Sequence, residues 1–145
     1  MDAVIFHKAL VAVDGSEQAQ RAVEMAIKLA QSGVVEQVVL YHVYDNSPVD
    51  VTKLHNLERL DAIRADSQAL LTGYAQQFLD VGLQPKLKRA GGDPATLIVD
   101  LVENDGEFDL VIMGNRRLNQ FQKLVLGSVS DRVTRLVEVP VLTIK

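Results

Sequence analysis

The chain alternates between short apolar runs and longer segments of helical periodicity. Three runs are almost wholly apolar, at 9–13, 38–43 and 110–113, and such runs are typical of strands buried on both faces of a parallel sheet. A fourth apolar run, at 140–144, closes the chain. The segment at 84–90 is more polar and contains a proline, which favours a strand at a sheet edge. The pattern therefore predicts five strands.

Helical patterns fill the intervals between these strands. Four helices are expected, beginning after Ser16, near Lys53, at Pro94 and at Ser128. Ser16 and Asp93 are suitable cap residues, and proline is favoured at the first position of a helix. Gly73 lies inside the second helix, where glycine costs about 1 kcal/mol relative to alanine, so that helix can bend or break there. Strict alternation of strands and helices predicts an α/β three-layer sandwich with a five-stranded parallel sheet and right-handed crossovers.

Composition agrees with one globular domain spanning residues 1–145. Of the 145 residues, 48% are apolar and 23% are charged, and none is cysteine, which excludes disulfides and thiolate metal sites. The net charge of -4 and the absence of tryptophan argue against a nucleic-acid partner. No apolar run approaches the roughly 18 residues of a membrane span, and the N-terminus lacks the pattern of a signal peptide. We expect a cytoplasmic protein without a membrane partner.

The candidate chemistry lies where strands end. In an open parallel sheet, ligands bind beyond the carboxyl ends of the strands, near the switch point of the topology. Asp14 follows the first strand, where a carboxylate can accept hydrogen bonds from ribose hydroxyls or hold a divalent metal. The sequence Asp14-Gly15-Ser16 is equally good turn and cap chemistry, so the residues alone leave both interpretations open.

A second candidate site lies at the start of the last helix. Gly127 and Ser128 precede a helix N-terminus, which favours anions, and Ser130 adds a hydroxyl. The preceding loop carries basic residues and no acid, namely Arg116, Arg117 and Lys123. This composition suits a phosphate cradle. The competing interpretation, which the residues alone favour, is that Ser128 only caps the helix and that the basic residues are solvated.

Other site types are not supported. Neither G-x-G-x-x-G nor G-x-x-x-x-G-K-[ST] occurs at the required place, and Asp14 lacks the acidic neighbour of a phosphoacceptor site. The histidines His7, His42 and His55 have no metal-ligand spacing, and we expect His42 to be a packed or hydrogen-bonded core residue. No residue is evident as a nucleophile or general base, so no catalytic residue and no metal site are predicted.

Four segments together resemble the universal stress protein family. They are LVAVDGS at 10–16, VIMG at 111–114, GSVSDRV at 127–133 and VPVL at 139–142. The resemblance covers nearly the whole chain and implies strand order 3-2-1-4-5 in an adenine-nucleotide alpha-hydrolase-like fold. It also implies a cytoplasmic stress-response protein that is commonly a homodimer. The apolar last strand, Val141–Ile144, is then expected to pair with its twin.

The resemblance bears directly on a ligand. Nucleotide-binding members carry G-x2-G-x9-G-[ST], which Gly114 and the pair Gly127-Ser128 match at the right spacing. Arg117 replaces the second glycine, and its side chain can either block the site or grip a phosphate. The implied ligand is ATP or another adenine nucleotide, with Mg²⁺ carried by the nucleotide.

The resemblance also assigns roles to individual positions. Ala12 and Val13 are expected on the adenine side, Asp14 at the ribose, and Val43 packed on adenine. The other expected contacts are Met113, Gly114, Arg116, Arg117, Gly127, Ser128, Val129 and Ser130.

Three functions follow in order of preference. The first is a stress-response regulatory protein that binds an adenine nucleotide at the carboxyl ends of the first, second and fourth strands. The second is a nucleotide-free dimeric interaction module, because Arg117 departs from the motif. The third is a slow ATPase, which ranks last because no catalytic group is evident.

Overall fold

The protein contains a parallel sheet covered by helices on both faces. The structure is a computed structural model, and it describes residues 4–46, 53–115 and 128–145. Within these ranges strands and helices alternate as β1 (Phe6–Val13), α1 (Glu17–Gln31), β2 (Val35–Tyr44), α2 (Leu54–Leu79), β3 (Lys86–Gly91), α3 (Pro94–Asp105), β4 (Leu110–Gly114), α4 (Ser128–Leu136) and β5 (Val141–Ile144). The strands are parallel and lie in the order β3-β2-β1-β4-β5. The predicted fold class and strand order are therefore confirmed.

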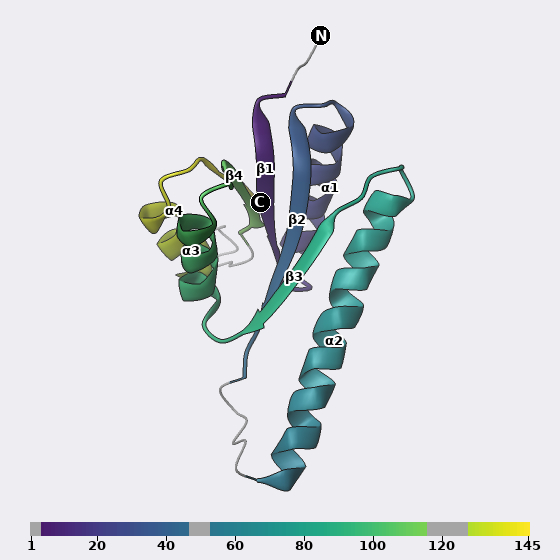
Figure 1. The fold of residues 1–145 in the computed structure, drawn as a ribbon, viewed down its shortest axis with the longest axis vertical. Helices are drawn as coiled ribbons and strands as arrows, with labels where there is room; N and C mark the ends of the chain where they lie inside the picture. The colour runs from purple at the N-terminus through teal and green to yellow at the C-terminus, as the bar shows by residue number, and fades with distance from the viewer. Residues whose placement is uncertain (1–3, 47–52, 116–127) are drawn as a thin grey trace, which may run out of the picture.

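Side chains that alternate along the central strands divide the core into two layers. Ala9, Val11 and Val13 of β1 pack with α1 and α2, whereas Leu10 packs with α3 and α4 on the opposite face. Figure 1 shows α1 and α2 on one side of the sheet and α3 with α4 on the other. Burial on both faces explains why the central strands read as continuous apolar runs.

The helix ends follow the predicted capping chemistry. The Ser16 hydroxyl oxygen accepts a hydrogen bond from the Ala19 N–H at 3.1 Å, and the Asp93 carboxylate accepts one from the Thr96 N–H at 3.0 Å. Gly106 ends α3 in the left-handed conformation, with φ of 72°. The two hydrogen bonds satisfy N–H groups that the start of a helix leaves without intrahelical partners.

Helix α2 is continuous through Gly73, the residue at which the sequence allowed a bend or a break. The helix is 26 residues long. Leu71, Tyr74 and Phe78 on either side of Gly73 are buried against the sheet, so tertiary packing outweighs the low helix propensity of glycine. Strand β3 lies at the sheet edge as its polar sequence predicts.

Candidate functional site

A crevice of about 790 Å³ opens outside the carboxyl ends of β1, β2 and β4. From β1 the chain passes through α1 to β2 on one side, whereas the connection through α3 reaches β4 on the other side. The crevice therefore lies at the switch point of the sheet, where open α/β proteins bind ligands. Its volume is in the usual range of small-molecule sites, about 300–1,000 Å³.

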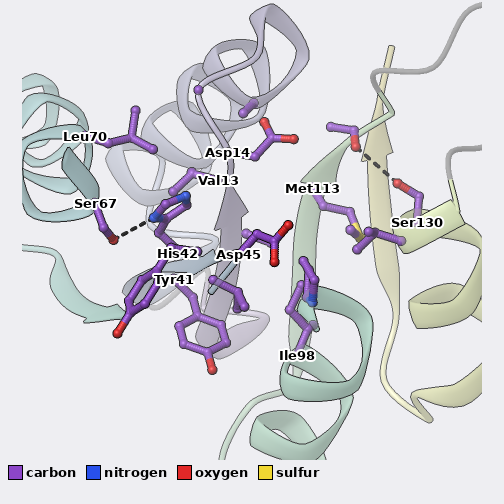
Figure 2. A pocket seen from close by; sticks show the side chains of 18 of the residues that line it. Val13, Asp14, Tyr41, His42, Asp45, Ser67, Leu70, Ile98, Met113 and Ser130 are labelled. Carbon is purple, nitrogen blue, oxygen red and sulfur yellow. Dashed lines mark hydrogen bonds between the residues drawn. The ribbon is translucent and has the colours of Figure 1, made fainter. Parts of the chain in front are cut away.

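The predicted site residues that the structure describes all line this crevice. They are Ala12, Val13, Asp14, Val43, Met113, Gly114, Ser128, Val129 and Ser130. Arg116, Arg117 and Gly127, together with Lys123 of the same loop, lie outside the described residues. Three segments far apart in the sequence are thus brought together at one end of the sheet (Figure 2).

Asp14 serves local structure and also faces the crevice. Its Oδ1 atom accepts hydrogen bonds from the Ser16 N–H at 3.0 Å and from the Ser16 hydroxyl at 2.6 Å. Ser16 in turn caps α1, so the carboxylate is held in place by the start of that helix. The two interpretations of Asp14 are therefore compatible, because an exposed carboxylate fixed in this way can still meet a ligand.

The start of α4 forms the opposite wall. Ser128 is exposed, whereas Ser130 is buried and its hydroxyl donates a hydrogen bond to the Gly114 carbonyl at 3.2 Å. Figure 2 shows this bond joining the start of α4 to the end of β4. Ser130 therefore ties the two elements together, and Ser128 is the serine of the pair that is exposed to solvent.

Gly114 is required by packing within the protein. A Cβ atom at this position would lie 2.5 Å from the carbonyl carbon of Gln18 and 2.7 Å from its oxygen. The first turn of α1 therefore lies directly against the end of β4. The first glycine of the nucleotide motif allows this close approach, whatever else it does for a ligand.

The pocket wall formed by α2 was not predicted from the sequence. Ile63, Ser67 and Leu70 line it, and Ser67 is only 1% exposed. These residues have i, i+4 and i+7 spacing, which places them on one face of the helix. That spacing was the only sequence pattern that pointed to a shared wall. Their position against β2 depends on long-range packing, which this spacing does not reveal.

His42 of β2 contacts this wall. Its Nδ1 atom and the Ser67 hydroxyl are 2.6 Å apart, so the histidine is hydrogen-bonded as the sequence predicted, but it is only half-buried and lines the crevice, so it is not a core residue. Burial lowers the pKa of His42 below its usual value, and the negative charge of Asp14 opposes that shift. His42 is therefore mostly neutral at pH 7, since its ordinary pKa of about 6.5 is already below that pH.

On the α3 side the crevice is more apolar. Tyr41 is buried there, and burial raises the pKa of its phenol. Pro94 and Ile98 complete this wall with Val43. A flat apolar group such as a nucleobase suits these side chains, because ligand pockets combine apolar walls with a few polar groups.

The charged residues of the described lining are acidic. Asp14, Asp45 and Asp66 supply the carboxylates. Even so, no group of three or more histidine, cysteine, aspartate or glutamate side chains in the described ranges is arranged to hold a metal ion. In the same part of the chain, no helix is long and apolar enough to cross a membrane.

The profile of the Universal stress protein family matches residues 6–145. The chain therefore belongs to this family. It is similar to universal stress protein YxiE of Bacillus subtilis (strain 168), with 27% identity over 97% of this chain and 100% of the relative.

Solved structures agree with the family assignment. The chain is 27% identical to hypothetical protein MJ0577, with a TM-score of 0.83 and coverage of 98% of this chain and 97% of the other. Universal stress protein UspA from Lactobacillus plantarum is 25% identical, with a TM-score of 0.81 and coverage of 96% and 97%.

Two more distant structures share the fold. One is a universal stress protein in complex with cAMP, which is 23% identical, with a TM-score of 0.71 and coverage of 97% of each chain. The other is a universal stress protein family protein from Arabidopsis thaliana with AMP bound, 22% identical, with a TM-score of 0.70 and coverage of 96% and 91%.

Proposed function

We propose that this protein binds an adenine nucleotide in the crevice at the carboxyl ends of β1, β2 and β4 and acts in a stress response. The observation that carries the proposal is the crevice itself, in which a strand-end carboxylate and a helix N-terminus face each other across apolar walls. Family membership supports the stress-response role. The AMP and cAMP complexes of two family members support the choice of an adenine nucleotide, since the same fold accommodates that ligand class there.

The residues present fit the parts of an adenine nucleotide. The base packs between Val43 and the apolar α3 wall, and Asp14 accepts hydrogen bonds from ribose hydroxyls. The phosphates lie at the N-terminus of α4, where the first N–H groups have no intrahelical partners and the helix dipole favours negative charge. Ser128 is exposed beside them and adds a hydroxyl donor. Any Mg²⁺ arrives with the nucleotide.

We expect Asp14→Asn to weaken binding of ATP, ADP and AMP by about tenfold or more, because a hydrogen bond to a charged group contributes roughly 1.5–3 kcal/mol. Isothermal titration calorimetry measures the dissociation constants. Asp109→Asn is the matched control. The Asp109 carboxylate also accepts hydrogen bonds from backbone N–H groups, those of His7 and Lys8, but it lies at the opposite end of the sheet. That variant should leave the affinities unchanged.

A wild-type protein that gives no heat with any of the three nucleotides would contradict the nucleotide proposal. The alternative is then a nucleotide-free interaction module. One residue of the sequence supports it, because Arg117 occupies a position where nucleotide-binding members have glycine. In that case Arg117→Gly should create a nucleotide-dependent rise in melting temperature that the wild type lacks.

We also propose that two copies pair through β5. This strand lies at the edge of the sheet, and Leu142 on it is 37% exposed. An apolar edge strand presents unpaired backbone groups and side chains that a second copy can cover. We also propose that the protein is cytoplasmic, as its sequence leads us to expect.

We expect Leu142→Glu to convert a dimer into a monomer, because the two-fold axis would place like charges opposite each other. Light scattering coupled to size-exclusion chromatography gives the mass. Leu87→Glu is a close control, since Leu87 is also 37% exposed and lies on β3 at the other edge of the sheet. A wild-type monomer, or a dimer broken only by Leu87→Glu, would rule out β5 as the interface.

A further inference from the structure

His42 presents a hydrogen-bonding atom to the crevice. Its Nδ1 atom is engaged by the Ser67 hydroxyl at 2.6 Å. Its second ring nitrogen, Nε2, has no hydrogen-bond partner among the described residues, and no side-chain nitrogen or oxygen there is both buried and unpaired. Nε2 is therefore accessible to solvent or ligand. Figure 2 shows it on the side of the ring away from Ser67.

The surroundings fix the orientation of this ring. Val13, which pairs with His42 in the sheet, and Leu70 of α2 are apolar neighbours in the same wall. Ser67, being almost fully buried, holds Nδ1 from the helix side. The ring is already held by a short hydrogen bond and by packing, so it loses little conformational entropy when Nε2 binds a ligand. A hydrogen bond from Nε2 therefore adds to the affinity with little entropic cost.

The hydrogen bond to Ser67 is compatible with either neutral tautomer of the His42 ring. A neutral imidazole carries a hydrogen on one nitrogen and accepts a hydrogen bond at the other. The carboxylate of Asp14 acts electrostatically on His42, and negative charge on the crevice side of the ring would favour the tautomer whose N–H is at Nε2. The Ser67 hydroxyl then donates to Nδ1, and Nε2–H is a donor facing the crevice.

A donor on His42 and the carboxylate of Asp14 line the same crevice at the ends of the neighbouring strands β1 and β2, and together they match a specific ligand group. A hydroxyl both donates and accepts hydrogen bonds. It can donate to Asp14 and accept from Nε2–H of His42 at once. Within an adenine nucleotide, such groups are the ribose hydroxyls.

We propose that His42, oriented by Ser67, recognises a ribose hydroxyl together with Asp14 and makes the crevice selective for ribonucleotides over deoxyribonucleotides. The inference rests on the proposed function and adds a specificity-determining residue to it. A ligand that lacks the hydroxyl leaves the polar groups of the site unpaired, which is the strongest basis that a binding site has for rejecting an analogue.

The experiment compares ATP with 2′-deoxy-ATP and 3′-deoxy-ATP by isothermal titration calorimetry. The wild type should bind at least one deoxy analogue about tenfold more weakly than ATP. His42→Gln places an amide N–H near the position of Nε2 and should retain part of this preference. His42→Asn places its amide near Nδ1 instead, and it should bind ATP and that analogue equally. His7→Asn, at the opposite end of the sheet, should keep the wild-type ratio.

The outcomes distinguish a failure of nucleotide binding from a failure of hydroxyl recognition by His42. No binding of any nucleotide by the wild type overturns the proposed function and this inference with it. Equal binding of ATP and both analogues by the wild type overturns the inference alone. Retention of the full preference in His42→Asn shows that His42 does not read the hydroxyl. A packing role alone would change the affinity for all three ligands by the same factor.

A measurement on the wild type keeps the inference testable if His42→Asn does not fold. Nitrogen NMR of the imidazole ring reports the tautomer and the hydrogen bond at Nε2. ATP should shift the His42 Nε2 resonance, and the deoxy analogue that binds weakly should leave it near its ligand-free position when the site is saturated. The same shift with ATP and with both analogues would overturn the inference.

Discussion

Replacement of Phe78 by alanine is expected to lower the free energy of unfolding by about 4 kcal/mol, because large aromatic residues in a core contribute roughly 3–5 kcal/mol. Phe78 is the largest of the fully buried side chains in the described part of the chain, at 1% exposure. It lies in the core layer that joins α1, α2 and the sheet. Denaturant unfolding followed by circular dichroism measures the change.

Leu79→Ala is the control, since Leu79 is the next residue on α2 and is 44% exposed. Its replacement should change the free energy of unfolding by less than about 1 kcal/mol. Similar losses in the two variants would show that α2 is not anchored through Phe78. The anchoring of α2 by Phe78 matters for the site, because Ser67 and Leu70 of the crevice wall belong to the same helix.

Local chemistry made most of the fold predictable. The apolar runs and the caps at Ser16 and Asp93 each act within a few residues, and the structure contains all of them. The polar sequence of β3 identified an edge strand because an edge exposes its side chains to water.

Gly73 shows how packing can outweigh a local preference. Glycine lowers helix propensity at any interior position, but α2 is held by side chains that contact the sheet on either side of Gly73. A loss of about 1 kcal/mol in propensity is small beside the burial of Leu71, Tyr74 and Phe78. The sequence pattern contained both signals, and only the packing decides between them.

The candidate site was predictable where strand ends define it. Asp14, Val43 and Gly114 follow directly from the rule that ligands bind beyond the carboxyl ends of parallel strands. The α2 wall was not, because the contact between His42 and Ser67 joins residues that are 25 positions apart. That contact depends on how α2 lies across the sheet, which no local pattern specifies.

Gly114→Ala is expected to lower the free energy of unfolding by about 3 kcal/mol without any nucleotide present, because overpacking typically costs 1–3 kcal/mol and occasionally more. The new Cβ would meet the Gln18 carbonyl carbon at 2.5 Å, well inside the optimal carbon–carbon separation of about 3.5–4.0 Å. The obstacle is backbone, so α1 would have to move as a unit. Thermal and denaturant unfolding of the ligand-free protein measure the loss.

Gly73→Ala is the matched control for this change. A Cβ atom at Gly73 meets nothing within 4 Å, so alanine should stabilise α2 by roughly 0.5–1 kcal/mol. If Gly114→Ala leaves the ligand-free stability unchanged and weakens only nucleotide binding, the glycine serves the ligand and not the packing of α1. If it destabilises the protein as expected, the loss reaches the site as well, because α1 begins at Ser16, whose N–H and hydroxyl hold the Asp14 carboxylate. The same glycine then maintains both the packing of the sheet end and the position of the carboxylate proposed to meet the ribose.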